Sequence, residues 1–154
     1  MAEFRKGQIF SADFAIAAAL FATALALFLS ASQSHSALQA QASRNAALLD
    51  ASMQAASAAA GLCSASGAFD GRFDAAAVQD FFTLSKTDYE LARKKLGLLQ
   101  GASNYDFSAS LSVPSGLVGQ AGMNPPASGS KSVFRRNGLY GNQSAILELE
   151  VWER

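Results

Sequence analysis

The sequence has few of the residues from which reactive centres are built. Its 154 residues include one cysteine, Cys63, and one histidine, His35, which excludes a disulfide or a cysteine metal cluster within it. Twelve Lys and Arg residues balance twelve Asp and Glu residues, which argues against nucleic acid as the main partner, because phosphate binding needs concentrated positive charge. It has neither a glycine-rich phosphate loop nor the carboxylate spacing of a calcium loop. We therefore expect no catalytic residues, no cofactor and no metal site.

What the sequence does have is a strongly apolar N-terminal run. From Phe14 to Leu29 there is no charge, and Thr23 carries the only hydroxyl. As a helix, residues 9–29 would span about 30 Å, the thickness of a bilayer's hydrocarbon core. Arg5 and Lys6 precede the run, which predicts a cytoplasmic N-terminus and an exported remainder.

Three interpretations of this run are open. It is a secretory signal cleaved near Ser30-Ala31-Ser32, an uncleaved single-span anchor, or a helix retained after a leader (residues 1–7) is removed between Gly7 and Gln8. Residues 30–60 contain no Gly or Pro and are rich in Ala, which favours one helix over residues 8–60, about 75 Å long. A flexible Ala/Ser linker is the alternative for this second stretch.

The rest of the chain, residues 61–154, predicts a small exported domain that begins with two short helices. The first lies near 74–83, with Asp74 as its N-cap, and the second lies near 88–96. Thr87 and Glu90 have the spacing of a capping box for the second helix. Other expected features are a buried face of Val78, Phe81 and Phe82, and a solvated helix end of Arg93, Lys94 and Lys95.

Three strands are expected to follow. Residues 104–113 alternate apolar and polar side chains and end at Pro114, and the other strands lie near 131–140 and 145–153. Between them, residues 114–130 are rich in Gly, Pro and Ser and predict a long surface loop. The hairpin turn is either Asn137-Gly138 or Gly141-Asn142-Gln143, and the second is preferred because it pairs longer strands.

These elements predict an α+β fold, in which a long N-terminal hydrophobic helix packs against a small antiparallel sheet with short helices. Apolar and alanine residues of the long helix recur at spacings of three and four, and Gly61 is expected to end it. The stripe is Leu38, Ala42, Ala46, Leu49, Met53, Ala56 and Ala60. We expect Leu38, Leu48, Leu49 and Met53 to complete the domain core, with Trp152 at one edge of the sheet's apolar face.

Several motifs resemble those of one family. Arg5-Lys6-Gly7-Gln8, followed by Ile9-Phe10-Ser11-Ala12-Asp13 and the apolar run, resembles the class III signal peptide of archaeal type IV pilin-like proteins. The tail is similar too, in its Tyr-x-x-x-Arg-Lys-Lys-Leu-Gly segment, its Asn-Tyr-Asp-Phe strand and its closing Leu-Glu-Leu-Glu-Val-Trp strand. The resemblance implies a type IV pilin-like fold, cleavage between Gly7 and Gln8 by a prepilin-peptidase-like enzyme, membrane residence before assembly, and a cell-surface homopolymer that acts in attachment.

The resemblance also implies assembly residues on the apolar run. Asp13 would pair with the new N-terminal amine of a neighbouring subunit or set the register, although it stands sixth after the cleavage point where the family has its acid fifth. The other assembly residues would be Phe14, Ile16, Leu20, Phe21, Leu25 and Phe28. Alternatively, Asp13 and Ser11 satisfy the first amide groups of the helix.

Two further functions fit the same pattern. The chain could be a minor pilin-like component of a secretion or filament machine, or a single-pass membrane-anchored extracellular binding domain. For the surface filament, the loop at 114–130 is the best candidate for outward contacts. Asn142-Gln143-Ser144 matches the sequence that accepts N-linked glycans and lies in an expected turn, so Asn142 is a candidate glycosylation site.

Overall fold

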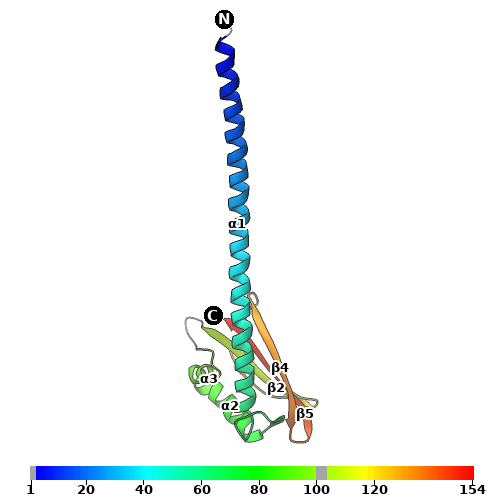
Figure 1. Ribbon diagram of the computed structural model, residues 1–154. Coiled ribbons are helices and arrows are strands. Elements are labelled where there is room, and N and C mark those ends of the chain that lie inside the picture. The colour runs from blue at the N-terminus through cyan, green and yellow to red at the C-terminus, as the bar shows by residue number, and fades with distance from the viewer. Residues whose placement is uncertain (1–2, 100–103) are drawn as a thin grey trace. The chain divides into compact units, whose positions relative to one another are not determined.

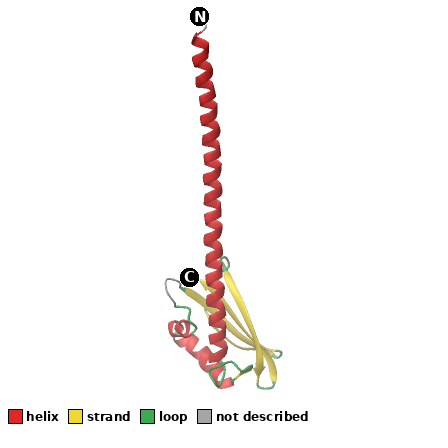
Figure 2. Cartoon of the chain, viewed as in Figure 1, coloured by secondary structure: helices red, strands yellow, loops and turns green. Residues whose placement is uncertain are grey.

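A computed structural model describes the backbone of residues 3–99 and 104–154 and, within those ranges, the side chains from residue 12 onward. The fold class is α+β, as predicted, with a long apolar N-terminal helix, two short helices and a five-stranded sheet, an arrangement consistent with a pilin-like fold (Figures 1 and 2). The chain forms two compact units, Met1–Ser43 and Arg44–Arg154. The second unit begins before the expected boundary at residue 61, because the last turns of the long helix belong to the domain.

The long helix is α1, Glu3–Leu62. Its residues favour this conformation, since no Gly or Pro occurs between Gln8 and Ala60 and alanine has the highest helix propensity. The hydroxyl of Thr23 donates a 2.8 Å hydrogen bond to the carbonyl of Ala19, so it needs no partner outside the helix. The helix interpretation of residues 30–60 is confirmed, and the linker alternative is wrong.

The short helices are α2, Ala75–Thr87, and α3, Tyr89–Lys95. Asp74 caps α2 as predicted, accepting a 2.9 Å hydrogen bond from the amide of Ala77. The capping box of Thr87 and Glu90 is wrong. Because α2 continues through Thr87, Asp88 becomes the N-cap of α3 and accepts from the amide of Leu91 at 3.0 Å.

Three of the five strands were predicted. They are β2 (Tyr105–Val113), β4 (Lys131–Tyr140) and β5 (Gln143–Glu153), and they lie in a sheet of order β1-β4-β5-β2-β3. β4 and β5 pair through Tyr140 and Gln143, which confirms the preferred turn at Gly141-Asn142. The two-residue β1, Arg72–Phe73, pairs parallel with β4 and makes the sheet mixed rather than purely antiparallel.

The fifth strand, β3 (Gly116–Gly122), corrects the prediction of a loop over residues 114–130. It pairs antiparallel with β2, and its glycines hide the alternation that normally identifies a strand. Gly119 is required by packing, because a Cβ atom built there would lie 2.7 Å from the Phe82 ring. The predicted loop is therefore shortened to the residues between β3 and β4.

The core of the second unit lies between one face of the sheet and the helices. Alternate residues of β2 and β5 form this face, and α2 covers it with Val78, Phe81 and Phe82, which are buried as predicted. The sheet residues in the core are Phe107, Ala109 and Leu111 on β2, and Ala145, Leu147, Leu149 and Val151 on β5. Trp152 is buried but lies outside this cluster, since strand alternation points it away from the side of Val151. Its expected place on the apolar face is wrong.

The face that the last turns of α1 contribute to the core coincides only in part with the predicted stripe, of which Ala56 and Ala60 are buried. Leu48 is buried, but Leu38, Leu49 and Met53 are 66%, 50% and 51% exposed. The buried face consists mainly of small residues, which allow close packing: Ser52, Ala55, Ala56, Ala59 and Ala60. Leu49 and Met53 each follow a buried residue by one position, a rotation of about 100° around the helix, which turns them toward solvent.

Candidate membrane and assembly segment

The predicted membrane and assembly residues lie on the apolar segment, which we define as residues 12–29 of α1. The described helix Ala12–Leu62, which begins with this segment, is long and apolar enough by length and composition to cross a membrane. All described side chains from Ala12 to Ala47 are exposed, and that of Phe14 is 75% exposed. The large apolar residues of the segment with no cover are Phe14, Ile16, Leu20, Phe21, Leu25, Leu27, Phe28 and Leu29.

Large and small side chains occupy different sides of the apolar segment. The phenylalanines recur every seven residues, at Phe14, Phe21 and Phe28, so they fall close together around the helix. Another side carries only alanine, at Ala12, Ala15, Ala19, Ala22 and Ala26, with alternating spacings of three and four. Alanine faces of this kind let helix backbones approach one another closely in an apolar medium. The segment therefore has both bulky and flat surfaces for lipid or for other helices.

Asp13 lies inside the helix and not at its start. α1 begins at Glu3, so the backbone amide of Asp13 is ten residues into the helix. The first amide groups, which lack intrahelical partners, belong to earlier residues. The alternative in which Asp13 and Ser11 cap the helix start therefore does not fit the intact chain. The Asp13 side chain is exposed at the entrance of the apolar segment.

The expected cleavage point lies in the first turns of α1. The backbone of Gly7 and Gln8 is helical, whereas the side chains of Gln8 and Ser11 lie outside the described residues, as do Met1 and Ala2. The prediction of cleavage between Gly7 and Gln8 stays a prediction.

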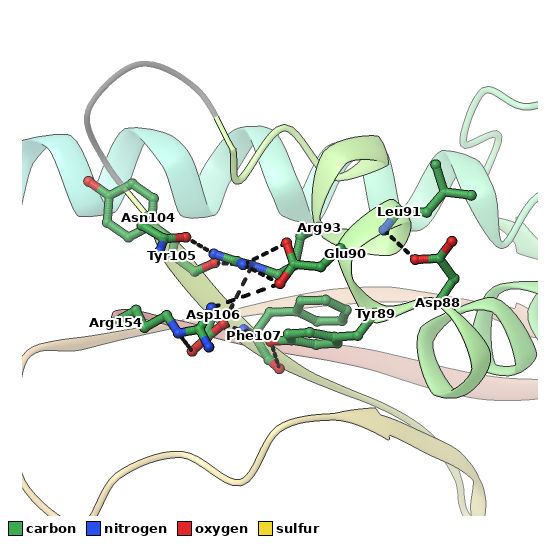
Figure 3. A network of polar contacts seen from close by, with 10 residues as sticks. All are labelled: Asp88, Tyr89, Glu90, Leu91, Arg93, Asn104, Tyr105, Asp106, Phe107 and Arg154. Carbon is green, nitrogen blue, oxygen red and sulfur yellow. Dashed lines mark hydrogen bonds and ion pairs between the residues drawn. The ribbon is translucent and has the colours of Figure 1, made fainter.

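The most densely connected polar cluster lies in the domain and is centred on Arg93 (Figure 3). Arg93 was expected at a solvated helix end, but its side chain is only 1% exposed, which makes that expectation wrong for Arg93, whereas Lys94 and Lys95 are exposed. Its guanidinium donates to the Tyr105 carbonyl at 2.8 Å, to Glu90 at 2.9 Å and to the Asn104 side chain. It also lies 3.4 Å from the buried carboxylate of Asp106.

Tyr89 completes this cluster on the side of β2. Its hydroxyl donates to the Asp106 carboxylate at 3.2 Å and accepts from the amide of Phe107 at 3.0 Å. Its ring stacks on that of Phe107 with centroids 5.1 Å apart. Burial, with the nearby Asp106 carboxylate, raises the pKa of Tyr89 to about 12. Since its groups are satisfied by one another, the cluster fastens α3 to the start of β2 and leaves no polar group directed at a ligand.

The remaining candidates for a chemical role are the Cys63 thiol, a metal site and a surface groove. Cys63 is fully buried, and desolvation raises its pKa to about 12, so the thiolate does not form near neutral pH. Among the described side chains, residues 12–99 and 104–154, no three of His, Cys, Asp or Glu lie close enough together to hold a metal ion. A shallow groove of about 540 Å³ between α2 and β3 includes Lys86, Tyr89 and Gln120. Its open shape suits surface contact better than enclosure of a small molecule.

The predicted assembly residues thus lie on one uncovered segment of the first unit, and Asn142 lies at the β4–β5 turn of the second unit. No protein-family model, curated protein or solved structure matches this chain.

Proposed function

We propose that this chain is a structural subunit of an archaeal type IV pilus-like surface filament and polymerises through the apolar segment of α1. The observation that carries the proposal is that one helix contains both the uncovered apolar segment and part of the domain core. Its last turns bury Leu48, Ala55 and Ala59 in the second unit. Cleavage near Ser32, as in simple secretion, would cut this helix in the middle.

The free-energy cost of exposing the apolar segment to water supports a permanent apolar partner for it. Eight large apolar side chains are exposed there, and each costs about 1.5–3 kcal/mol when left in water. The total, on the order of 10–20 kcal/mol, exceeds the stability of many whole domains. A soluble monomer with this segment is therefore strongly disfavoured, whereas lipid or a bundle of sister helices removes the cost.

Lipid and sister helices can exchange with little change in hydrophobic free energy, because both are apolar. The alanine side of the segment favours sister helices, since close backbone contact adds van der Waals attraction that disordered lipid chains do not match. The large residues Phe14, Leu20 and Phe28 would then fill the spaces between neighbouring subunits. We propose these contacts as the core of the filament, with the second unit outermost and acting in surface attachment.

Asp13 gains a role in this arrangement. A carboxylate inside an apolar medium is costly unless it is paired. After cleavage between Gly7 and Gln8 by a prepilin-peptidase-like enzyme, each subunit would carry a positive α-amino group close to its own segment. The Asp13 of a neighbouring subunit would pair with that group and set the register between subunits.

Mass spectrometry of the native N-terminus tests the proposal most directly. A chain that starts at Gln8 supports it, a chain that starts at Met1 supports a plain membrane anchor, and a start near Ser32 supports simple secretion. Electron microscopy of material sheared from the cell surface supplies the second test. Fibres whose main polypeptide is this chain support a structural subunit, whereas a trace amount in fibres of another protein indicates a minor component.

A further inference from the structure

The turn between β4 and β5 contains a motif that filament assembly does not use. The chain has five asparagines, and only Asn142 is followed two positions later by Ser or Thr, with no proline between. This is the sequence that N-glycosylation enzymes accept. The other four are Asn45, Asn104, Asn124 and Asn137.

The turn presents Asn142 to solvent. Tyr140 and Gln143 form the last cross-strand pair, which leaves Gly141 and Asn142 as a two-residue connection. Gly141 has a φ of +59° and Asn142 does not have a positive φ, the pattern of a type II′ hairpin turn. A Cβ atom built at Gly141 would meet nothing within 4 Å. Asn142 itself is exposed, so its side chain is accessible to a modifying enzyme.

The third residue of the motif, Ser144, is also accessible. The Ser144 side chain is exposed, although its backbone is held in β5 opposite Leu139. A glycan on Asn142 would displace no core side chain, since the nearest buried residue of β5, Ala145, points to the other side of the sheet from Ser144. The folded domain can carry the modification without repacking.

We propose that Asn142 is N-glycosylated after the domain has crossed the membrane. The co-reactant is a sugar chain joined at its anomeric carbon to a polyprenyl phosphate or diphosphate. The amide nitrogen Nδ2 of Asn142 bonds to that carbon and loses one proton. The bond from the carbon to the phosphate oxygen breaks, and the lipid phosphate leaves with the electron pair. This step needs export of the domain but not filament assembly.

A sugar on Asn142 would also change the surface next to the turn. Leu139, opposite Ser144, and Ile146, two residues further along β5, are 40% and 41% exposed on the sheet face opposite the core. A hydrophilic glycan rooted at the adjacent turn would reduce the apolar area that this face presents to water. Unintended association between exposed sheet faces would decrease accordingly.

Mass spectrometry of the full chain purified from the cells that produce it tests the assignment. Trypsin cleaves after Arg136 and Arg154, so one peptide, residues 137–154, contains the whole turn. Electron-transfer fragmentation should place a mass of whole sugar residues on Asn142. Asn142→Gln and Ser144→Ala should each abolish that mass, whereas Ser144→Thr should retain it.

Asn137→Gln is the matched control, because Asn137 lies in the same peptide and on the same hairpin but outside the motif. It should leave the sugar unchanged. A native peptide found only without sugar overturns the assignment, as does sugar attached to Ser144 or retained by Asn142→Gln. Because these results do not depend on fibres, a glycosylated chain that starts at Met1 would refute the filament proposal and still support this one.

Discussion

Replacing Arg93 by Met should lower the free energy of unfolding of the domain by about 3 kcal/mol. Met retains most of the volume of the arginine stem, so the change removes the charge and the donors without opening a large cavity. Arg93 is the most buried charged side chain among the described residues, and the Asp106 carboxylate beside it is only 6% exposed. Without the guanidinium, that carboxylate remains buried with less compensation.

The magnitude follows from what would remain around Asp106. Breaking a buried ion pair by removing one partner costs about 3–5 kcal/mol. Two contacts persist: the Tyr89 hydroxyl at 3.2 Å and Nε of Arg154 at 3.8 Å from the second carboxylate oxygen. Arg154 is half exposed, so its compensation is weak. The Tyr105 carbonyl also loses its donor, which adds to the cost. The contacts that persist at Asp106 offset part of the total, so we place the net loss near the lower end of that range.

Trp152 reports this change directly. It is the only tryptophan, it is buried, and it is the cross-strand partner of Asp106. Urea unfolding of the full chain in detergent, followed by Trp152 fluorescence, should show a lower midpoint for Arg93→Met. Lys94→Met is the matched control on the same turn, and because Lys94 is exposed it should change stability by less than about 0.5 kcal/mol. Equal effects for the two variants would refute the role assigned to Arg93.

Three more predictions address other parts of the chain. Asp13→Ala should reduce sheared fibres while the membrane-bound pool persists, with Asp13→Glu restoring part of the loss; normal fibres in Asp13→Ala would contradict the pairing role. Gly119→Ala should destabilise the domain by about 1–3 kcal/mol because the added methyl overlaps Phe82, and Phe82→Leu should recover part of this in the double variant; an additive result would contradict the overlap. Burial raises the pKa of Cys63 from 9.0 to about 12 and that of Tyr89 from 10.0 to about 12. The stabilisation that comes from burying the two neutral groups is complete below pH 9. It is lost as pH rises toward 12, because the unfolded chain ionises at lower pH than the folded one. Between pH 9 and 10 this loss comes mainly from Cys63, and unfolding measurements on Cys63→Ala should show a flatter pH dependence there; an unchanged slope would contradict it.

The elements that were predicted correctly have local signals. Asp74 stands before an apolar helical pattern, β2 alternates apolar and polar residues, and Gly141-Asn142 separates two runs suited to strands. Each signal reflects the backbone or side-chain preferences of a few neighbouring residues. Such preferences act before tertiary contacts form, which is why the sequence alone reveals them.

The features that were missed depend on partners far along the chain. Arg93 has the sequence context of an exposed helix end, and its burial follows from Asn104, Tyr105 and Asp106, which meet it only after β2 packs against α3. No local signal in the sequence indicates this burial, because Asp106 occupies a polar position of the alternating strand, where a solvated side chain is expected. β3 was missed because its glycines remove the apolar–polar alternation, and the packing of Gly119 against Phe82 depends on a helix far along the chain.

The side of α1 that packs in the domain also could not be predicted from the pattern of large apolar residues. Ser52, Ala55 and Ala59 are buried, whereas Leu49 and Met53 are exposed, so the side of α1 that enters the core carries small side chains. The apolar segment also has a side that carries only small residues, in this case alanine. A helix that buries a small-residue face within its own domain thus has a second such face for packing between subunits. The exposed Leu49 and Met53 then have the same requirement as the apolar segment, a partner that removes them from water, and a neighbouring subunit would supply it along with the cover for residues 12–29.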